Sequence, residues 1–246
     1  MLNNIQNTIH ITHLYPRHMS LYGDRGNIIV LAHKAKLAGI EIVLQNCSVG
    51  ESINPKCQII LLGGGQDNDQ EIIQNDLLKR QNELSDLIKN GSTFLGICGG
   101  FQLLGQSYQT ANGQEIQGLG FLNMKTINAK PDEKRIIGNA IAESPVFGKL
   151  IGYENHGGRT FLPPELKPLG QIVQGGGNNG QDKSEGVLTQ WEKGLILGTY
   201  FHGFLPKNPQ VANYLIQRFF PNFKILNKSL SLLESMNQAN NLKLSY

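Results

Sequence analysis

The sequence has few of the features that mark secreted, membrane-spanning or nucleic-acid-binding proteins. It contains only three cysteines, Cys47, Cys57 and Cys98, which form neither a CxxC pair nor an even disulfide framework. No apolar run is long enough to span a membrane, and the first residues do not resemble a signal peptide. The formal net charge of +3 is too small and scattered to attract nucleic acid. We therefore expect a cytoplasmic protein whose thiols stay reduced.

The sequence does contain an alternation of strand and helix patterns in its first half. Segments 8–15, 41–49, 57–65 and 92–98 are predicted as strands, and segments 27–40 and 69–91 as helices. This alternation is typical of an α/β fold with a doubly wound, mostly parallel sheet and helices on both faces. The second half is richer in strand patterns and ends with a predicted helix over 208–220. With no visible linker, 1–246 is interpreted as one domain with a core of about 8–220, and the tail 224–246 as helical and then frayed.

A lone cysteine stands among glycines in GICGGFQ (96–102), at the end of a buried strand pattern. A nucleophile on a sharp strand-to-helix turn needs such neighbours, because the backbone is strained and packing is close. A thiol at a helix N-terminus also gains thiolate character, and the Gly99 amide is then placed to donate to an oxyanion. The alternative is a small buried cysteine that happens to end a strand. We favour Cys98 as a nucleophile.

A cysteine nucleophile needs a base, normally histidine, and two of the six histidines stand beside glycine. His202 follows the buried strand pattern LILGTYF, and His156 lies in GYENHGGRT. Three further glycines, at 63–65, follow another strand but lack the lysine and hydroxyl residue of a phosphate-binding loop. Their amides are predicted either to donate to an oxyanion or simply to form a tight turn. The residues alone leave both bases and both uses of the glycines open.

Together these segments resemble class I (triad-type) glutamine amidotransferases of the cobyric-acid-synthase-like branch. GICGGFQ matches the motif Gly-x-Cys-x-Gly-x-Gln, and LLGGGQDNDQ, GYENHGGRT and LGTYFHGFLPKNP follow the order of that branch. The stretch LYGDRGN near the start is similar to the GatD group, the glutaminase subunits of lipid II isoglutaminyl synthase. The resemblance covers about residues 8–220 and implies a flavodoxin-like fold.

The resemblance implies a glutaminase that hydrolyses L-glutamine through a thioester on Cys98. His202 then corresponds to the general base, with His156 as a secondary candidate. An arginine suits the α-carboxylate of glutamine because its planar fork can pair with both oxygens. The residues implied to form the oxyanion hole or to contact substrate are Gly64, Gly65, Gly99, Gln102 and Arg135.

One departure from the wider class concerns the acid that orients the histidine. Most class I enzymes carry a glutamate two residues after it, whereas Gly203 and Phe204 follow His202. A cysteine–histidine pair without this acid is expected to be weak, because nothing fixes the imidazole tautomer. The carboxylate could come from Glu154 or Glu185 of this chain, or from a partner subunit. The resemblance favours the partner.

The implied partner is a MurT-like subunit of the Mur ligase family, in a heterodimer. ATP and magnesium are expected on that subunit, and no cofactor or metal is expected in this chain, which lacks a P-loop motif. Ammonia would then amidate the α-carboxyl of D-glutamate in the lipid II stem peptide, a step of peptidoglycan biosynthesis. Two alternatives stay open: a glutaminase for another acceptor, such as a corrinoid carboxylate, and a non-catalytic binding module.

Overall fold

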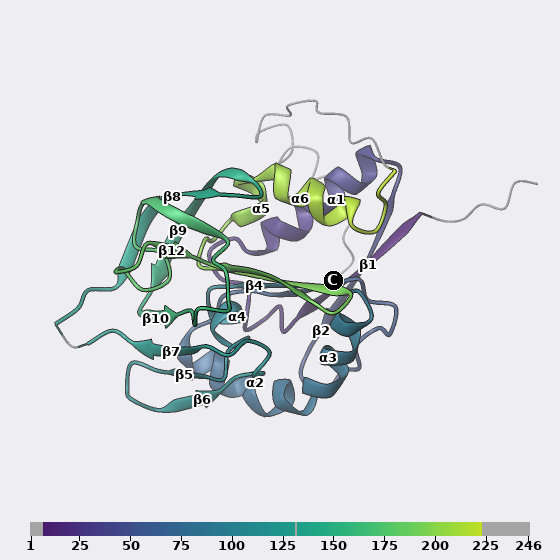
Figure 1. The fold of residues 1–246 in the computed structure, drawn as a ribbon. Coiled ribbons are helices and arrows are strands. Elements are labelled where there is room, and N and C mark those ends of the chain that lie inside the picture. Colours follow the sequence, from purple (N-terminus) through teal and green to yellow (C-terminus); the bar gives the residue numbers. More distant parts are fainter. Residues whose placement is uncertain (1–6, 131, 223–246) are drawn as a thin grey trace, which may run out of the picture.

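A six-stranded sheet of order β13-β14-β4-β3-β1-β2 runs through the computed structural model, which describes residues 7–130 and 132–222 (Figure 1). Its parallel strands are β1 (Thr8–Leu14), β2 (Glu41–Cys47), β3 (Ile59–Leu62), β4 (Thr93–Ile97) and β14 (Gly194–Thr199). Strand β13 (Val187–Trp191) pairs antiparallel with β14 at one edge. The central strands β3 and β4 are buried along their whole length, as continuous apolar runs predict for a parallel sheet covered on both faces.

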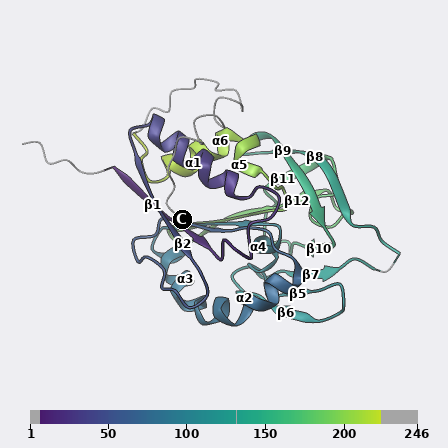
Figure 2. The ribbon, with the colours of Figure 1, turned by 180° about the vertical axis from the view of Figure 1, so that it is seen from behind.

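Helices cover both faces of this sheet. Helices α1 (Arg25–Leu37), α5 (Phe204–Lys207) and α6 (Pro209–Gln217) lie on one face, and α2 (Asp67–Lys79) and α3 (Gln81–Lys89) lie on the other, as Figure 1 and Figure 2 show. The single helix predicted over 69–91 is wrong in one respect, because it is interrupted at Arg80. Arg80 ends α2 and precedes α3, with φ −87° and ψ −2°, and its buried guanidinium binds the Asp76 carboxylate one turn earlier. The predicted doubly wound α/β class is otherwise confirmed.

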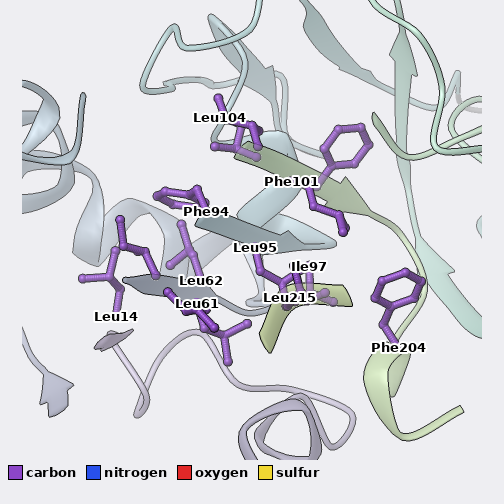
Figure 3. Packing of buried hydrophobic residues seen from close by; sticks show 14 of the residues in the cluster. Leu14, Leu61, Leu62, Phe94, Leu95, Ile97, Phe101, Leu104, Phe204 and Leu215 are labelled. Carbon is purple, nitrogen blue, oxygen red and sulfur yellow. The ribbon is translucent and has the colours of Figure 1, made fainter. Parts of the chain in front are cut away.

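The hydrophobic core lies on both sides of the central strands. Successive strand residues point to opposite faces, so Phe94 packs toward Phe101 and Leu104 (Figure 3). On the other face Leu95 lies toward Leu215 of α6 (Figure 3). All five side chains are fully buried. Burial of each contributes roughly 1.5–3 kcal/mol to folding, which holds the strand ends in fixed positions.

Two smaller sheets form the strand-rich second half. One has the order β10-β7-β5-β6 and the other β12-β11-β8-β9. Their strands are β5 (Ser107–Gln109), β6 (Glu115–Gln117), β7 (Lys125–Asn128), β8 (Ile136–Ser144), β9 (Gly148–His156), β10 (Gly158–Phe161), β11 (Gly170–Gln174) and β12 (Ser184–Glu185). Strand β9 reaches the central sheet through a bridge between Tyr153 and His202. The predicted tail 224–246 lies outside the described residues. Of the helices that the structure describes, none could cross a lipid bilayer.

Four loops meet at the carboxyl ends of the parallel strands. They follow β1 (residues 15–24), β3 (63–66), β4 (98) and β14 (200–203). Parallel strands end at one edge, and open α/β sheets place their binding sites there. Helix α4 (Gly99–Gln102) is only one turn long, and it begins directly at that edge. The candidate residues from distant segments are therefore brought to one place.

Gly100 marks the tightest packing at this edge, since a Cβ atom there would overlap the carbonyl oxygen of Leu62. We expect Gly100→Ala to lower the free energy of unfolding by about 2 kcal/mol or more through overpacking. The control is Gly113→Ala, where a Cβ would meet nothing within 4 Å but the backbone is left-handed at φ +86°. That variant should lose only about 1–2 kcal/mol. Chemical denaturation measures both, and equal losses would contradict the packing argument.

Candidate active site

Cys98 occupies the sharp turn between β4 and α4. Its backbone lies at φ 50° and ψ −104°, a region that non-glycine residues rarely adopt. The turn is held from both sides: the Cys98 amide donates to Thr199 O (2.8 Å), and its carbonyl accepts from the Gln102 amide (3.0 Å). The side chain is 8% exposed. The structure thus shows the strained strand-to-helix geometry expected of a nucleophile.

His202 lies beside Cys98, at the end of β14. Its backbone amide donates to Tyr153 O (2.9 Å), and the side chain is only 2% exposed. A Cβ atom added to Gly64 would lie 2.7 Å from Cε1 of His202 and 3.4 Å from Cβ of Cys98. The imidazole and the thiol therefore flank Gly64 together. Within the described residues Nε2 of His202 has no hydrogen-bond partner, which leaves it open toward a reacting group.

The carboxylate that meets His202 belongs to Asp24, which the sequence analysis missed. Asp24 directly precedes α1 and is fully buried. Its Oδ1 accepts a hydrogen bond from Nδ1 of His202 (3.1 Å), and its Oδ2 accepts from the Gly64 amide (2.7 Å). A carboxylate can only accept, so Nδ1 carries the proton and Nε2 is left to exchange protons with the thiol. Asp24, His202 and Cys98 thus form an acid–histidine–thiol arrangement.

The Asn27 side chain links the loop of Asp24 to the segment after His202 by hydrogen bonds. Its side-chain amide donates to the Asp24 carbonyl (2.8 Å), and its side-chain oxygen accepts from the Leu205 amide (2.8 Å). Asn27 is fully buried, so both bonds are made without competition from water. This one side chain therefore fixes the distance between the start of α1 and the residues after His202.

The expected sources of the orienting acid were wrong. Glu154 is bound to the backbone amides of Gly176 (3.0 Å) and Gly177 (2.6 Å) in a glycine-rich loop. Glu185 accepts from the Thr199 hydroxyl and from the Tyr200 amide (3.1 Å). Neither touches His202. Because the Asp24 carboxylate already occupies Nδ1, the structure also leaves no place there for a carboxylate from a partner.

The protonation of His202 follows from these neighbours. Burial by itself lowers the pKa of His202, but the hydrogen bond to Asp24, together with the nearby Cys98 sulfur and the charges of both groups, raises it to about 10. The protonated imidazole is therefore favoured between the carboxylate and the sulfur. Such an imidazolium can supply the proton that a departing amine needs.

Of the glycine amides predicted to bind an oxyanion near Cys98, one already donates to a side chain and two do not. The Gly64 amide is committed to Asp24, so its predicted use in an oxyanion hole is wrong. The amides of Gly65 and Gly99 donate to no other group in the described part of the chain. A Cβ atom on Gly99 would lie 3.1 Å from the Gly65 nitrogen, so the two residues are close neighbours. Gly65 and Gly99 are the pair left to bind an oxyanion.

Gln102 is buried behind this turn in a chain of polar side chains. Its Oε1 accepts from Nε2 of Gln70 (3.4 Å), and its Nε2 donates to the Tyr200 hydroxyl (3.3 Å). That hydroxyl is in turn bonded to Thr160 (2.7 Å). The structure places Gln102 next to the nucleophile but engages its amide within the protein. Gln70, on the first turn of α2, is a neighbour of Gly99 that the sequence analysis did not single out.

His156 lies apart from the thiol, in the core. Its Nδ1 donates to Gly158 O (2.9 Å), and its ring stacks on Tyr200 at 3.7 Å. Burial lowers the pKa of His156 to about 3, so it stays neutral. This environment is that of a structural histidine and favours His202 as the base.

Arg135 lies at the rim of the site and is exposed. Its guanidinium donates to the backbone carbonyl (3.2 Å) and side-chain oxygen (3.1 Å) of Asn155. Asn155 donates in turn to the Tyr22 hydroxyl (2.8 Å), and the Tyr22 ring lies edge-on to His202. Arg135 is thus connected to the catalytic pair through two side chains.

The signal for Asp24 was present in LYGDRGN, where an acid directly precedes α1. An aspartate there is normally explained as a helix cap, and only the fold shows that its side chain turns inward instead.

In the described residues, no group of three His, Cys, Asp or Glu side chains could hold a metal ion.

Comparisons with known proteins show which family the chain matches. Residues 10–210 match the model of the CobB/CobQ-like glutamine amidotransferase domain. The chain is 38% identical over 210 residues to the lipid II isoglutaminyl synthase (glutamine-hydrolyzing) subunit GatD of Staphylococcus aureus, covering 85% of this chain and 83% of that protein. It is 39% identical to the GatD of Streptococcus pneumoniae, covering 85% and 79%.

A solved glutamine amidotransferase from Thermotoga maritima superposes with a TM-score of 0.52 at 15% identity. The superposition covers 95% of this chain and 90% of the Thermotoga maritima chain. At this identity the likeness concerns the fold alone.

Asp24→Asn should change how stability depends on pH. The folded-state pKa of His202 is raised to about 10 from 6.5, so the stabilisation is complete below about pH 6.5 and is lost as pH rises toward 10. The asparagine removes the charge that maintains this shift, so the free energy of unfolding should fall less steeply between pH 7 and 10. Urea denaturation across that range measures the slope. Asp86→Asn, on the exposed face of α3, is the control and should keep the wild-type slope.

Glu185→Gln should remove a second pH dependence. Burial raises the pKa of Glu185 from 4.5 to about 8, so the folded state keeps a proton that the unfolded state releases. Stability from this group is complete below about pH 4.5 and is lost as pH rises through 8. The glutamine variant should therefore nearly match the wild type near pH 5 and be more stable at pH 8.5, by on the order of 4 kcal/mol. The same difference at both pH values, or a similar gain in exposed Glu143→Gln, would contradict the titration of Glu185.

Proposed function

The chain belongs to the family of CobB/CobQ-like glutamine amidotransferase domains, and from this membership we propose that it is the glutaminase subunit of a two-subunit amidating ligase. The observation that carries the proposal is the strained Cys98 beside a His202 whose Nδ1 is held by Asp24. Three groups with these roles, at the binding edge of an open sheet, are what thiol-dependent amide hydrolysis requires.

The proposed reaction begins when Cys98 sulfur attacks the side-chain carbonyl of L-glutamine. The thiol proton already resides on His202, so the sulfur attacks as a thiolate, and the amides of Gly65 and Gly99 hold the negative oxygen of the tetrahedral intermediate. The carbon–nitrogen bond then breaks, His202 returns the proton to the leaving nitrogen, and ammonia departs. Water activated by the same imidazole hydrolyses the γ-glutamyl thioester to glutamate. Asp24 keeps the imidazole in one tautomer throughout.

Arg135 is proposed to bind the α-carboxylate of the substrate. It is exposed at the rim of the site, and its present partner, Asn155, is neutral. A carboxylate makes a stronger, two-pronged bond to a guanidinium than an amide oxygen does. We propose that Gln102 lines the substrate site behind the Cys98 turn, where its own hydrogen bonds fix its position.

The proposed partner is a MurT-like ligase subunit, which would bind ATP and magnesium and receive the ammonia. The support is that relatives covering most of this chain are named as subunits of lipid II isoglutaminyl synthase. The acceptor would be the α-carboxyl of D-glutamate in the lipid II stem peptide, at the cytoplasmic side of the membrane. This chain's own step, hydrolysis of an amide by a thiol, needs no cofactor.

Co-expression with a MurT-like ligase tests the proposal. We expect hydrolysis of glutamine and ATP-dependent amidation of lipid II by the complex, and a loss of at least about 10³-fold in both reactions for Cys98→Ser. Diazo-oxo-norleucine, a reactive glutamine analogue, should label Cys98 but not the buried Cys47 or Cys57. No labelling with or without the ligase would overturn the catalytic proposal. Hydrolysis with amidation of a corrinoid instead of lipid II would overturn only the acceptor.

A further inference from the structure

Tyr22 adopts an unusual conformation next to the catalytic pair. It lies in the loop between β1 and α1, two residues before Asp24, with φ at 50°. A bulky residue in this left-handed region costs of order 1–3 kcal/mol and persists only where surrounding contacts compensate. Its side chain is also 54% exposed, so burial supplies only part of that compensation. The contacts that hold Tyr22 are therefore specific ones.

The Tyr22 ring packs against the imidazole of His202. The ring centroids are 4.8 Å apart at an angle of 61°, an edge-to-face contact. The Tyr153 ring also neighbours Tyr22, with the ring centroids 6.4 Å apart, and the Tyr153 carbonyl accepts the His202 amide (2.9 Å). His202 is thus held along its backbone by Tyr153 and along its ring by Tyr22.

The hydroxyl of Tyr22 is held by Asn155, whose amide has only one possible orientation. Arg135 can only donate, so Oδ1 of Asn155 faces the guanidinium at 3.1 Å from Nη2. Nδ2 is then turned toward Tyr22 and donates to its hydroxyl at 2.8 Å. These bonds fix the hydroxyl end of the tyrosine.

The hydrogen bond to Asp24 restrains only one atom of the imidazole. A ring held at Nδ1 can still tilt about that bond, and tilting moves Nε2, which has no partner among the described residues. An aromatic edge against the ring removes this freedom and also keeps water from the Asp24–His202 bond. Tyr22 is the side chain that provides both, since His202 is 2% exposed although it lies directly under an exposed tyrosine.

We propose that Tyr22 is a positioning residue for His202, and that Asn155 locks it in place. The catalytic role of His202 belongs to the proposed function. The contacts of the Tyr22 side chain with His202 and Asn155, called the brace below, do not depend on it. The titratable groups that face His202 are Asp24, Cys98, Tyr22, Tyr153 and His156. Of these, only Tyr22 combines contact with the ring and exposure to solvent.

The brace is tested first without substrate, by NMR of the full chain labelled with ¹⁵N-histidine. The proton on Nδ1 of His202, assigned with His202→Ala, should exchange slowly with water in the wild type. In Tyr22→Ala it should exchange at least about tenfold faster, because the ring edge that shields it is gone. Tyr22→Phe keeps the ring but loses the bond to Asn155, and it should give an intermediate rate, as should Asn155→Ala. Phe161→Ala, which removes an exposed aromatic of β10, is the matched control and should match the wild type.

The second measurement uses glutamine hydrolysis by the complex. Tyr22→Ala should lower kcat about 3- to 10-fold, the range expected for one aromatic contact, while KM stays within about twofold. Unchanged exchange of the Nδ1 proton together with unchanged kcat in Tyr22→Ala would overturn the proposal. If that variant fails to fold, wild-type exchange in both Tyr22→Phe and Asn155→Ala would overturn it instead. A complex that does not hydrolyse glutamine would defeat the proposed function, while the NMR result would still decide the brace.

Discussion

The buried carboxylate of Asp24 is the constraint on which the rest of the site depends. A carboxylate removed from water is costly unless its oxygens accept hydrogen bonds. Here one oxygen accepts from His202 and the other from the Gly64 amide, so three loops at the strand ends are joined at one point. Asn27 reinforces the junction by bonding both to Asp24 and to the residue after the His202 turn. Loss of that carboxylate would leave the His202 and Gly64 donors unpaired and would remove the hydrogen bonds that join the loops.

The strain at Cys98 is tolerated because the surrounding backbone is packed without gaps. Gly100 lies so close to Leu62 that no side chain fits between α4 and β3, and the Cys98 amide is bonded to the neighbouring strand. Strain that is held by a rigid sheet fixes the thiol at the carboxyl-terminal edge, beside His202. The same edge leaves the amides of Gly65 and Gly99 without partners, beside the thiol. The same close packing at this edge therefore holds the strained Cys98 turn and places the two amides beside the thiol.

Prediction from sequence succeeded where the evidence was local. Periodicity and apolar runs predicted β1, β2, β3 and β4 to within a few residues, and the glycines around Cys98 predicted its turn. It failed where distant groups meet. The helix over 69–91 is interrupted at Arg80, and Glu154 and Glu185 were considered for a role that Asp24 fills. Chain position alone does not show which carboxylate lies beside an imidazole 178 residues away.

The sequence by itself determined the parallel sheet, the strained turn at Cys98 and the placement of His202 at a strand end. These features follow from steric limits and hydrophobic periodicity, which act between near neighbours in the chain. Only the tertiary structure decided that Asp24 holds His202, that the Gly64 amide is used by Asp24, and that Asn155 reaches Tyr22. Hydrogen bonds between loops depend on the crossover connections, which bring the carboxyl ends of separate strands to one edge.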